Sequence, residues 1–424
     1  MKRRMLSTLI LLTMYSLATS QSAAFTPNYN DSKVPDYALP ELLMFEDGRI
    51  VTEPDHWPQR RKQILQLFEN EVYGKSPEWT GTIQAHTLFS DPAAFDGLAT
   101  AEEVLLTLQY EGRELEMYLL LYIPNTQPNA PMFLGYNFYG NYTTSPHPDV
   151  KVTQNWVMNN RSFGITENRA PDNLRNVRAH RWPFREMVSR GYAAGTIYYG
   201  DVDPDFDDGF MNGVHELMKS PADSSSWGSI AAWAWGLSRA ADYLETDNRI
   251  DHDRMAVIGH SRLGKAALWA GATDERFAMV ISNNSGCGGA ALSKRRFGET
   301  VGRINNQFPH WFTGNFNKYN NNEDALPVDQ HQLLALIAPR PLYVASATED
   351  LWADPYGEFL ATLEATKAYR LMGLTGMPVD EMPPPDKPVL NGTIGYHIRT
   401  GKHDITLYDW EQYMNFADGF WGVP

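Results

Sequence analysis

The spacing of apolar and polar residues changes in character along the chain. Residues 59–72 place apolar side chains at helical spacing and predict a helix that ends at Tyr73 and Gly74. Residues 104–110 alternate between apolar and polar, and residues 115–123 form an apolar run that ends at a proline. These two runs predict a β-hairpin that turns between them.

Beyond the hairpin, short apolar runs alternate with helical patterns. Buried runs of this length between helices indicate a parallel sheet covered on both sides, and therefore an α/β fold. No internal repeat and no proline- or serine-rich linker divides the chain, so we expect residues 25–424 to form a single domain. The runs expected to be strands are 131–137, 192–199, 255–258, 279–282 and 341–347, and the expected helices are 183–190, 226–245, 264–271 and 356–373.

The first residues have the order of a secretory signal peptide. Lys2, Arg3 and Arg4 precede an apolar run over residues 5–18, and small residues follow up to residue 24. The run is shorter than the roughly 20 residues that cross a bilayer, so cleavage is expected rather than anchoring. Residues 25–60, rich in Pro, Asn and Asp, are interpreted as an extended lead-in to the domain.

Composition narrows the class of protein further. Lys and Arg number 36 against 51 Asp and Glu, which gives a net charge of −15 and argues against nucleic acid or an anionic membrane as the main partner. A single cysteine, Cys287, excludes an intrachain disulfide and a cysteine-based zinc site. We therefore expect an enzyme without metal or cofactor, whose chemistry uses Ser, His and carboxylates.

The segment MAVIGHSRLGKAALWA at 255–270 combines an apolar strand, a sharp turn and a helix of small residues. Such a strand–turn–helix exposes a serine, here Ser261, as a nucleophile. Gly259 and Gly264 are small enough for the tight turn, although Leu263 stands where the usual G-x-S-x-G pattern has its last glycine. The helix N-terminus would place the Arg262 N–H near a developing oxyanion.

A serine nucleophile of this type needs an acid and then a histidine later in the chain. His403 lies in a glycine loop before the helical run 408–416, whereas His397 is interpreted as a strand residue within 394–398. The acid is expected just after the strand at 341–347, where Asp350 is the first choice and Glu349 stays an alternative. Asp354 precedes a proline and is interpreted as a helix N-cap.

A second acidic segment, GDVDPDFDDG at 200–209, carries alternating aspartates. A calcium loop would need an earlier glycine and a closing glutamate, and Pro204 interrupts the pattern. The segment fits a strand-to-helix loop near the site better than a metal site.

These motifs resemble the glucuronoyl esterases of carbohydrate esterase family 15. The resemblance rests on segments spread over most of the chain: YNFYGN at 136–141, YYGDVDPD at 198–205, GHSRLGK at 259–265, NNSGCGGA at 283–290, FPHWF at 308–312, EDLWADP at 349–355 and GKHD at 401–404. It implies the α/β-hydrolase fold and cleavage of the ester between 4-O-methylglucuronate on xylan and an aromatic alcohol of lignin.

The resemblance also implies roles for individual residues. Fungal relatives have a glutamate where this chain has Asn284, so the acid is expected at the later position used by some bacterial members, which is Asp350. The remaining implied roles are Ser261 as nucleophile, His403 as base, Arg262 at the oxyanion through its N–H and guanidinium, and Lys265, Glu299, Trp352 and Gln307 at the sugar. Lys265 in a structural salt bridge and Trp352 as a core aromatic remain alternatives.

The sequence thus predicts a secreted or periplasmic bacterial serine esterase, acting as a monomer on glucuronoxylan or lignin–carbohydrate esters, without nucleic acid or stable membrane association. An acetyl xylan esterase-like enzyme on the same fold is the alternative. A non-catalytic polysaccharide-binding protein is a third hypothesis, which a broken triad would favour.

Overall fold

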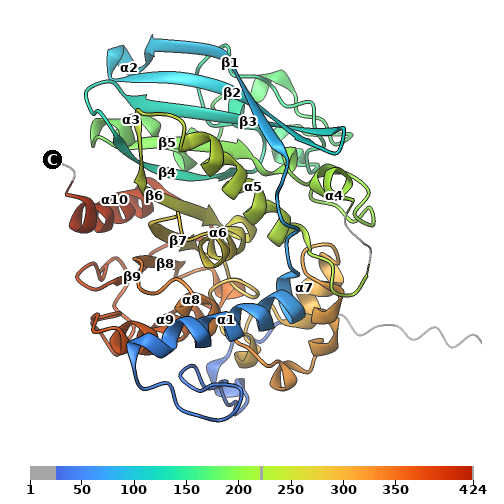
Figure 1. Ribbon diagram of the computed structural model, residues 1–424, viewed down its shortest axis with the longest axis vertical. Coiled ribbons are helices and arrows are strands. Elements are labelled where there is room, and N and C mark those ends of the chain that lie inside the picture. The colour runs from blue at the N-terminus through green and yellow to red at the C-terminus, as the bar shows by residue number, and fades with distance from the viewer. Residues whose placement is uncertain (1–24, 220–222, 423–424) are drawn as a thin grey trace, which may run out of the picture.

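A mixed nine-stranded sheet forms the framework of the molecule, with β1 at the top of the view and β7, β8 and β9 near its middle (Figure 1). The computed structural model describes residues 25–219 and 223–422, so the expected signal peptide lies outside the described residues. The strand order is β1-β2-β3-β5-β4-β6-β7-β8-β9. Their bounds are β1 Thr82–Ala93, β2 Ala99–Tyr110, β3 Arg113–Pro124, β4 Ala130–Asn137, β5 Ala193–Tyr198, β6 Ile250–His260, β7 Met279–Asn283, β8 Leu342–Ala347 and β9 Ile394–Arg399.

The sheet has an antiparallel part and a parallel part. β1, β2 and β3 pair antiparallel and β3 joins β5 antiparallel, while all strands from β5 to β9 in the sheet order pair parallel. The hairpin expected from the sequence is confirmed as β2 and β3, with Glu111 and Gly112 at positive φ in its two-residue turn. This architecture is the α/β-hydrolase fold.

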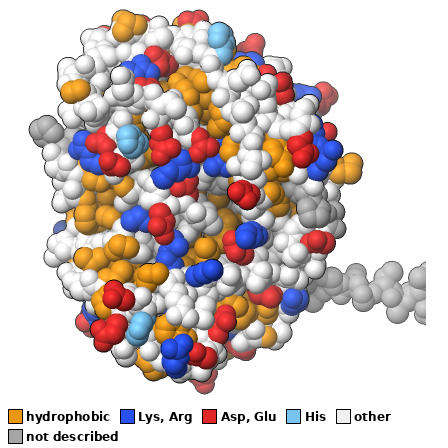
Figure 2. Space-filling model, in the orientation of Figure 1, with side chains coloured by type: hydrophobic (Ala, Val, Ile, Leu, Met, Phe, Trp, Pro, Cys, Tyr) orange, Lys and Arg blue, Asp and Glu red, His pale blue; other side chains and the backbone are white. Residues whose placement is uncertain are grey.

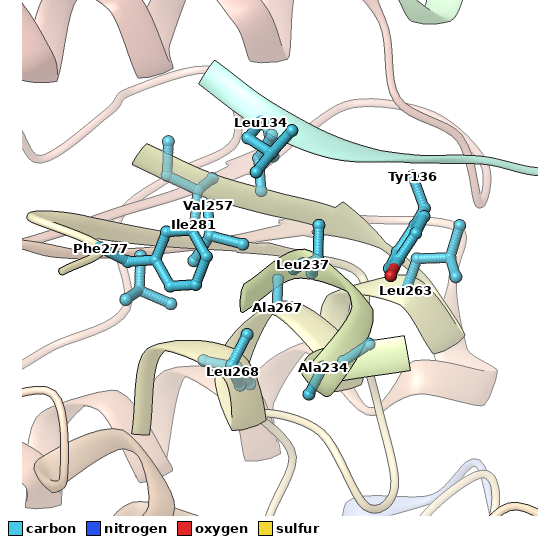
Figure 3. Close-up of a cluster of buried hydrophobic side chains, with 14 of the residues drawn as sticks. Leu134, Tyr136, Ala234, Leu237, Val257, Leu263, Ala267, Leu268, Phe277 and Ile281 are labelled. Carbon is cyan, nitrogen blue, oxygen red and sulfur yellow. The ribbon is translucent and has the colours of Figure 1, made fainter. Parts of the chain in front are cut away.

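Helices cover the parallel strands on both faces. Leu134 of β4 packs in a cluster with Leu237 and Ala267 from two helices of one face (Figure 3). The neighbouring Phe133 points to the other face and meets Trp410 at 5.7 Å between ring centroids. The helices are α1 Trp57–Phe68, α2 Ala94–Gly97, α3 Phe184–Ser189, α4 Gly213–Met218, α5 Ser229–Leu244, α6 Arg262–Thr273, α7 Val301–Gln307, α8 Gln330–Ala335, α9 Pro355–Leu371 and α10 Leu407–Trp421.

The strand β1 has no counterpart among the expected elements. Most of its side chains are exposed, and it pairs with β2 alone at the edge of the sheet. An edge strand whose two faces are both exposed to solvent is held by backbone hydrogen bonds to its neighbour rather than by burial of an apolar face. Its apolar pattern is correspondingly weak, which is why the sequence did not predict it.

The lead-in reaches the same end of the molecule as several loops that follow the strands. Asp31 forms an ion pair with the buried Arg295, and Asn28 accepts a hydrogen bond from the Gly298 N–H at 2.8 Å through its carbonyl. Phe25 packs edge-on against Trp352, with 6.1 Å between ring centroids. The start of the lead-in therefore packs against the domain, but the segment expected to be extended over residues 25–60 ends earlier, because α1 begins at Trp57.

Acidic and basic side chains are intermixed over the face drawn in Figure 2. Within residues 25–219 and 223–422, no helix is both long and apolar enough to cross a bilayer.

The parallel strands bring distant parts of the chain to one edge of the sheet. Ser261 follows β6, Asn284 follows β7, Asp350 follows β8 and His403 follows β9. Carboxyl ends of parallel strands share an edge, and this edge is where α/β folds bind their ligands. The topology therefore assembles the expected catalytic residues without any contact between them along the sequence.

Candidate active site

Ser261 occupies a sharp turn between β6 and α6. Its backbone has φ 59° and ψ −130°, a conformation that residues with a side chain rarely adopt. Its N–H donates to the Asn283 carbonyl at 2.9 Å, which ties the turn to the neighbouring strand end. A Cβ at Gly259 would lie 1.9 Å from the Leu263 carbonyl oxygen, so glycine is required there. The turn thus presents the serine hydroxyl at the sheet edge.

His403 and Asp350 are joined by a short hydrogen bond. His403 Nδ1 lies 2.5 Å from Asp350 Oδ2, and the carboxyl is buried while the imidazole is 40% exposed. This contact orients the ring and leaves Nε2 available for a hydroxyl proton. Glu349, the alternative acid, is exposed, and its backbone N–H donates to the Gly401 carbonyl. The structure places Asp350, and not Glu349, on the histidine.

Asn284 is part of the same arrangement. Its Nδ2 donates to Asp350 Oδ2 at 2.9 Å, the oxygen that also faces His403. The backbone of Asn284 has φ 48°, a left-handed conformation that asparagine tolerates better than most residues. The sequence suggested only that Asn284 cannot replace a missing acid. The structure shows that it holds the carboxylate of the later acid in place.

A cleft of about 380 Å³ opens beside the turn. All eight site residues expected from the sequence line it, so the fold brings the whole predicted set together. The lining residues are Ser261, Arg262, Lys265, Glu299, Gln307, Asp350, Trp352 and His403, together with Asn284, Ser285, Gly286, Phe308, Trp311 and Ala353.

Lys265 and Glu299 form the charged floor of the cleft. Lys265 is 4% exposed, and its Nζ donates to the Ser285 carbonyl. Burial lowers the pKa of Lys265, and the negative charge of Glu299 opposes that shift. Burial also raises the pKa of Glu299, against the positive charges of Lys265 and Arg262. Within the described part of the chain, no hydrogen-bonded salt bridge joins Lys265 to a carboxylate, which leaves the structural salt bridge considered from the sequence without support.

Two acidic side chains were missed as parts of this site. Asp205 accepts a hydrogen bond from the guanidinium of Arg262. Glu358 of α9 accepts from the Gly286 N–H at 3.0 Å and from the Ser346 hydroxyl at 2.6 Å, and so holds the loop that lines the cleft. In the sequence, the acidic motif around Asp205 could have indicated a role for that residue at the site. Glu358 could not have been found in this way, because it is a single glutamate in a helix and belongs to no motif.

The aspartates of the acidic loop do not converge on one point. Asp201 accepts from the Tyr118 N–H and from Asn155, whereas Asp205 faces Arg262. Among the residues that the structure describes, no group of three or more His, Cys, Asp or Glu side chains could hold a metal ion. The segment is a strand-to-helix loop after β5, as its sequence indicated.

Fold and site together define a hydrolase of the α/β-hydrolase class, and comparison with known proteins narrows that class further. The family description "Glucuronyl esterase, fungi" matches residues 217–373. Carbohydrate esterase MZ0003, from an unknown prokaryotic organism, is 48% identical over 92% of this chain and 91% of its own length. A 4-O-methyl-glucuronoyl methylesterase of Schizophyllum commune is 27% identical over 80% of this chain and 74% of its own.

Solved structures agree with these relatives. A promiscuous CE15 esterase from a marine bacterial metagenome superposes with a TM-score of 0.87 at 48% identity, covering 93% of this chain and 99% of the other. A glucuronoyl esterase from Solibacter usitatus gives 0.85 at 43% identity, covering 92% and 100%. The chain belongs to carbohydrate esterase family 15, the glucuronoyl esterases, and is a carboxylic ester hydrolase.

The buried Glu358 makes stability depend on pH. Burial raises its pKa from an ordinary 4.5 to about 8, so the folded state keeps a proton that the unfolded chain loses above pH 4.5. The resulting stabilisation is complete below pH 4.5 and is lost as pH rises through 8, by up to about 1.4 kcal/mol per pH unit. Glu358→Gln lacks this loss, so it should gain stability relative to the wild type between pH 5 and pH 8.

Urea unfolding of both proteins at the two pH values measures this difference. Glu411→Gln, at an exposed position of α10, is the matched control and should follow the wild type. A constant offset between Glu358→Gln and the wild type across this range would contradict the prediction.

Proposed function

We propose that this enzyme hydrolyses carboxyl esters of glucuronate and 4-O-methylglucuronate, with glucuronoxylan and lignin–carbohydrate esters as its natural substrates. The observation that supports this most is the cleft itself, in which the His403–Asp350 pair and Ser261 adjoin the basic side chains of Arg262 and Lys265. A relative at 22% identity has been solved with methyl 4-O-methyl-β-D-glucopyranuronate. The N-terminal pattern supports export of the mature domain.

The proposed reaction passes through an acyl-enzyme. Ser261 Oγ attacks the ester carbon while His403 Nε2 takes the hydroxyl proton, and Asp350 stabilises the imidazolium. The negative oxygen of the tetrahedral intermediate meets the N–H and guanidinium of Arg262. The alcohol then leaves with the proton from His403, and a water repeats these steps to release glucuronate and regenerate the serine.

The other cleft residues would recognise the sugar. Lys265 offers a hydrogen-bond donor and Glu299 an acceptor to hydroxyls of the sugar ring. Gln307 lines the same cleft and adds an amide that can donate or accept. Trp352 presents an indole whose edge-on contact with Phe25 keeps it in place beside the catalytic loop. These four side chains supply the preference for a uronate over a simple acyl group.

The substrate proposal is tested by comparing a benzyl glucuronate ester with p-nitrophenyl acetate. Ser261→Ala should abolish turnover of both. Lys265→Met keeps the length of the side chain but removes its donor, so it should lower kcat/KM on the glucuronate ester by about tenfold or more and leave the acetate nearly unchanged. Equal losses on both substrates, or a wild type that prefers acetyl esters, would indicate the acetyl esterase alternative.

The acid is tested by two neighbouring variants. Asp350→Asn removes the charge that stabilises imidazolium and should lower kcat by about a thousandfold or more. Glu349→Gln, one residue earlier and exposed, should stay within about twofold of the wild type. Comparable losses in the two variants, or a larger loss at Glu349, would refute the assignment.

A further inference from the structure

Asp205 is a fully buried carboxylate surrounded by donors from three separate segments. Its side chain is 0% exposed. Oδ1 accepts from His310 Nε2 at 2.9 Å and from Trp311 Nε1 at 2.7 Å, while Oδ2 accepts from the Tyr199 hydroxyl at 3.0 Å and from the Arg262 guanidinium. Both oxygens are therefore held before any substrate arrives.

The partner guanidinium is confined as well. Arg262 lies 4.6 Å from the centroid of the Trp311 ring and 5.2 Å from that of Phe308, and these two rings stack in parallel at 3.7 Å. Its side chain is only 17% exposed. Among the described residues its Nε has no hydrogen-bond partner, so Asp205 is its only hydrogen-bonded anchor.

This contact joins two motifs that had no role in the reaction so far. Asp205 ends the segment at 198–205, and His310 and Trp311 belong to the segment at 308–312. Burial favours a neutral carboxyl, but the positive charge of Arg262 and the hydrogen bonds from His310 and Trp311 outweigh it and hold the pKa of Asp205 below its usual range. A charged carboxylate thus faces Arg262 at working pH.

Fixed geometry matters because a cation stabilises an oxyanion best when it needs no reorganisation during the reaction. An arginine at the start of α6 has several rotatable bonds, and without an anchor it would sample positions away from Ser261. A buried guanidinium without a counter-charge would also be costly. Asp205 meets both needs, since it neutralises part of the charge and restricts the side chain on the side that faces away from solvent.

We propose that Asp205 is a positioning residue that holds the Arg262 guanidinium for the oxyanion of the ester reaction, and that Tyr199, His310 and Trp311 fix Asp205 for this task. This proposal rests on one part of the proposed function, namely that Ser261 is the nucleophile. It applies to any ester that the enzyme cleaves, because the oxyanion is common to all of them.

A double-mutant cycle separates this role from a merely structural one. Asp205→Asn keeps the shape but loses the charge, and should lower kcat on a methyl glucuronate ester roughly tenfold to a hundredfold with little change in KM. Arg262→Met should lower kcat at least as much. The double variant should be no slower than Arg262→Met alone, because Asp205 acts through Arg262. Losses that multiply in the double variant, or a change confined to KM, would overturn the proposal.

A matched control lies in the same loop. Asp203 is buried like Asp205 but faces His215, with 3.8 Å between Oδ2 and Nε2, and makes no contact with Arg262. Because Asp203 faces His215 and does not line the cleft, Asp203→Asn should leave kcat unchanged. If Asp203→Asn lowers kcat as much as Asp205→Asn does, the buried carboxyls of this loop support folding rather than position Arg262, and the proposal is overturned.

A milder variant keeps the test valid if Asp205→Asn fails to fold. Trp311→Phe removes one donor from Asp205 and retains an aromatic ring over Arg262. It should lower kcat by a smaller factor, and that loss should vanish in the Arg262→Met background. A loss that persists there would overturn the proposal.

The rate at which a fluorophosphonate labels Ser261 gives a readout that does not depend on the sugar. Labelling needs only the nucleophile, its base and the oxyanion donors, so it should follow the same cycle. A wild type that is labelled but does not cleave glucuronate esters would refute the proposed substrate and leave the role of Asp205 measurable. Unchanged labelling in Asp205→Asn would refute the positioning role.

Discussion

The strained backbone of Ser261 is the constraint on which the site depends. The turn from β6 into α6 can hold this residue at φ 59° only because Gly259 lets the Leu263 carbonyl approach and because the Asn283 carbonyl accepts the serine N–H. Such strain is stable where the surrounding structure determines it. Here the neighbouring parallel strand β7 ties down the turn through Asn283, and β8 and β9, further along the sheet, bring Asp350 and His403 to the same edge.

Around this turn, three buried carboxyl groups have different partners. Asp350 faces the His403 imidazole, Asp205 faces the Arg262 guanidinium, and Glu358 accepts hydrogen bonds from one backbone N–H and one hydroxyl. Their environments differ accordingly, since the ion pair lowers the pKa of Asp205 whereas burial raises that of Glu358 to about 8. A charged carboxylate therefore faces Arg262, whereas a neutral carboxyl holds the loop that lines the cleft.

Much of the fold and the core of the site could be predicted because their signals are local in sequence. Buried strands such as β6 and β8 show as apolar runs, and Ser261 stands between one of them and a helix. Chain order then selected His403. Asp350 and Glu349 are neighbours, so the sequence could prefer Asp350 but left Glu349 open, and the contact of Asp350 with His403 distinguishes them. Contacts across long separations, such as that of Asp205 with Arg262, left no pattern that one sequence could show, and the exposed β1 had no apolar face to reveal it.

The central claim, that Ser261 attacks a glucuronate ester and becomes acylated, is tested most directly by mass spectrometry. Enzyme quenched in acid during turnover of a methyl glucuronate ester would be digested, and its peptides mapped. We expect the mass of a glucuronoyl group on the peptide that contains Ser261, and its absence in Ser261→Ala. Turnover with the adduct on another residue, or undiminished turnover in Ser261→Ala, would contradict the mechanism.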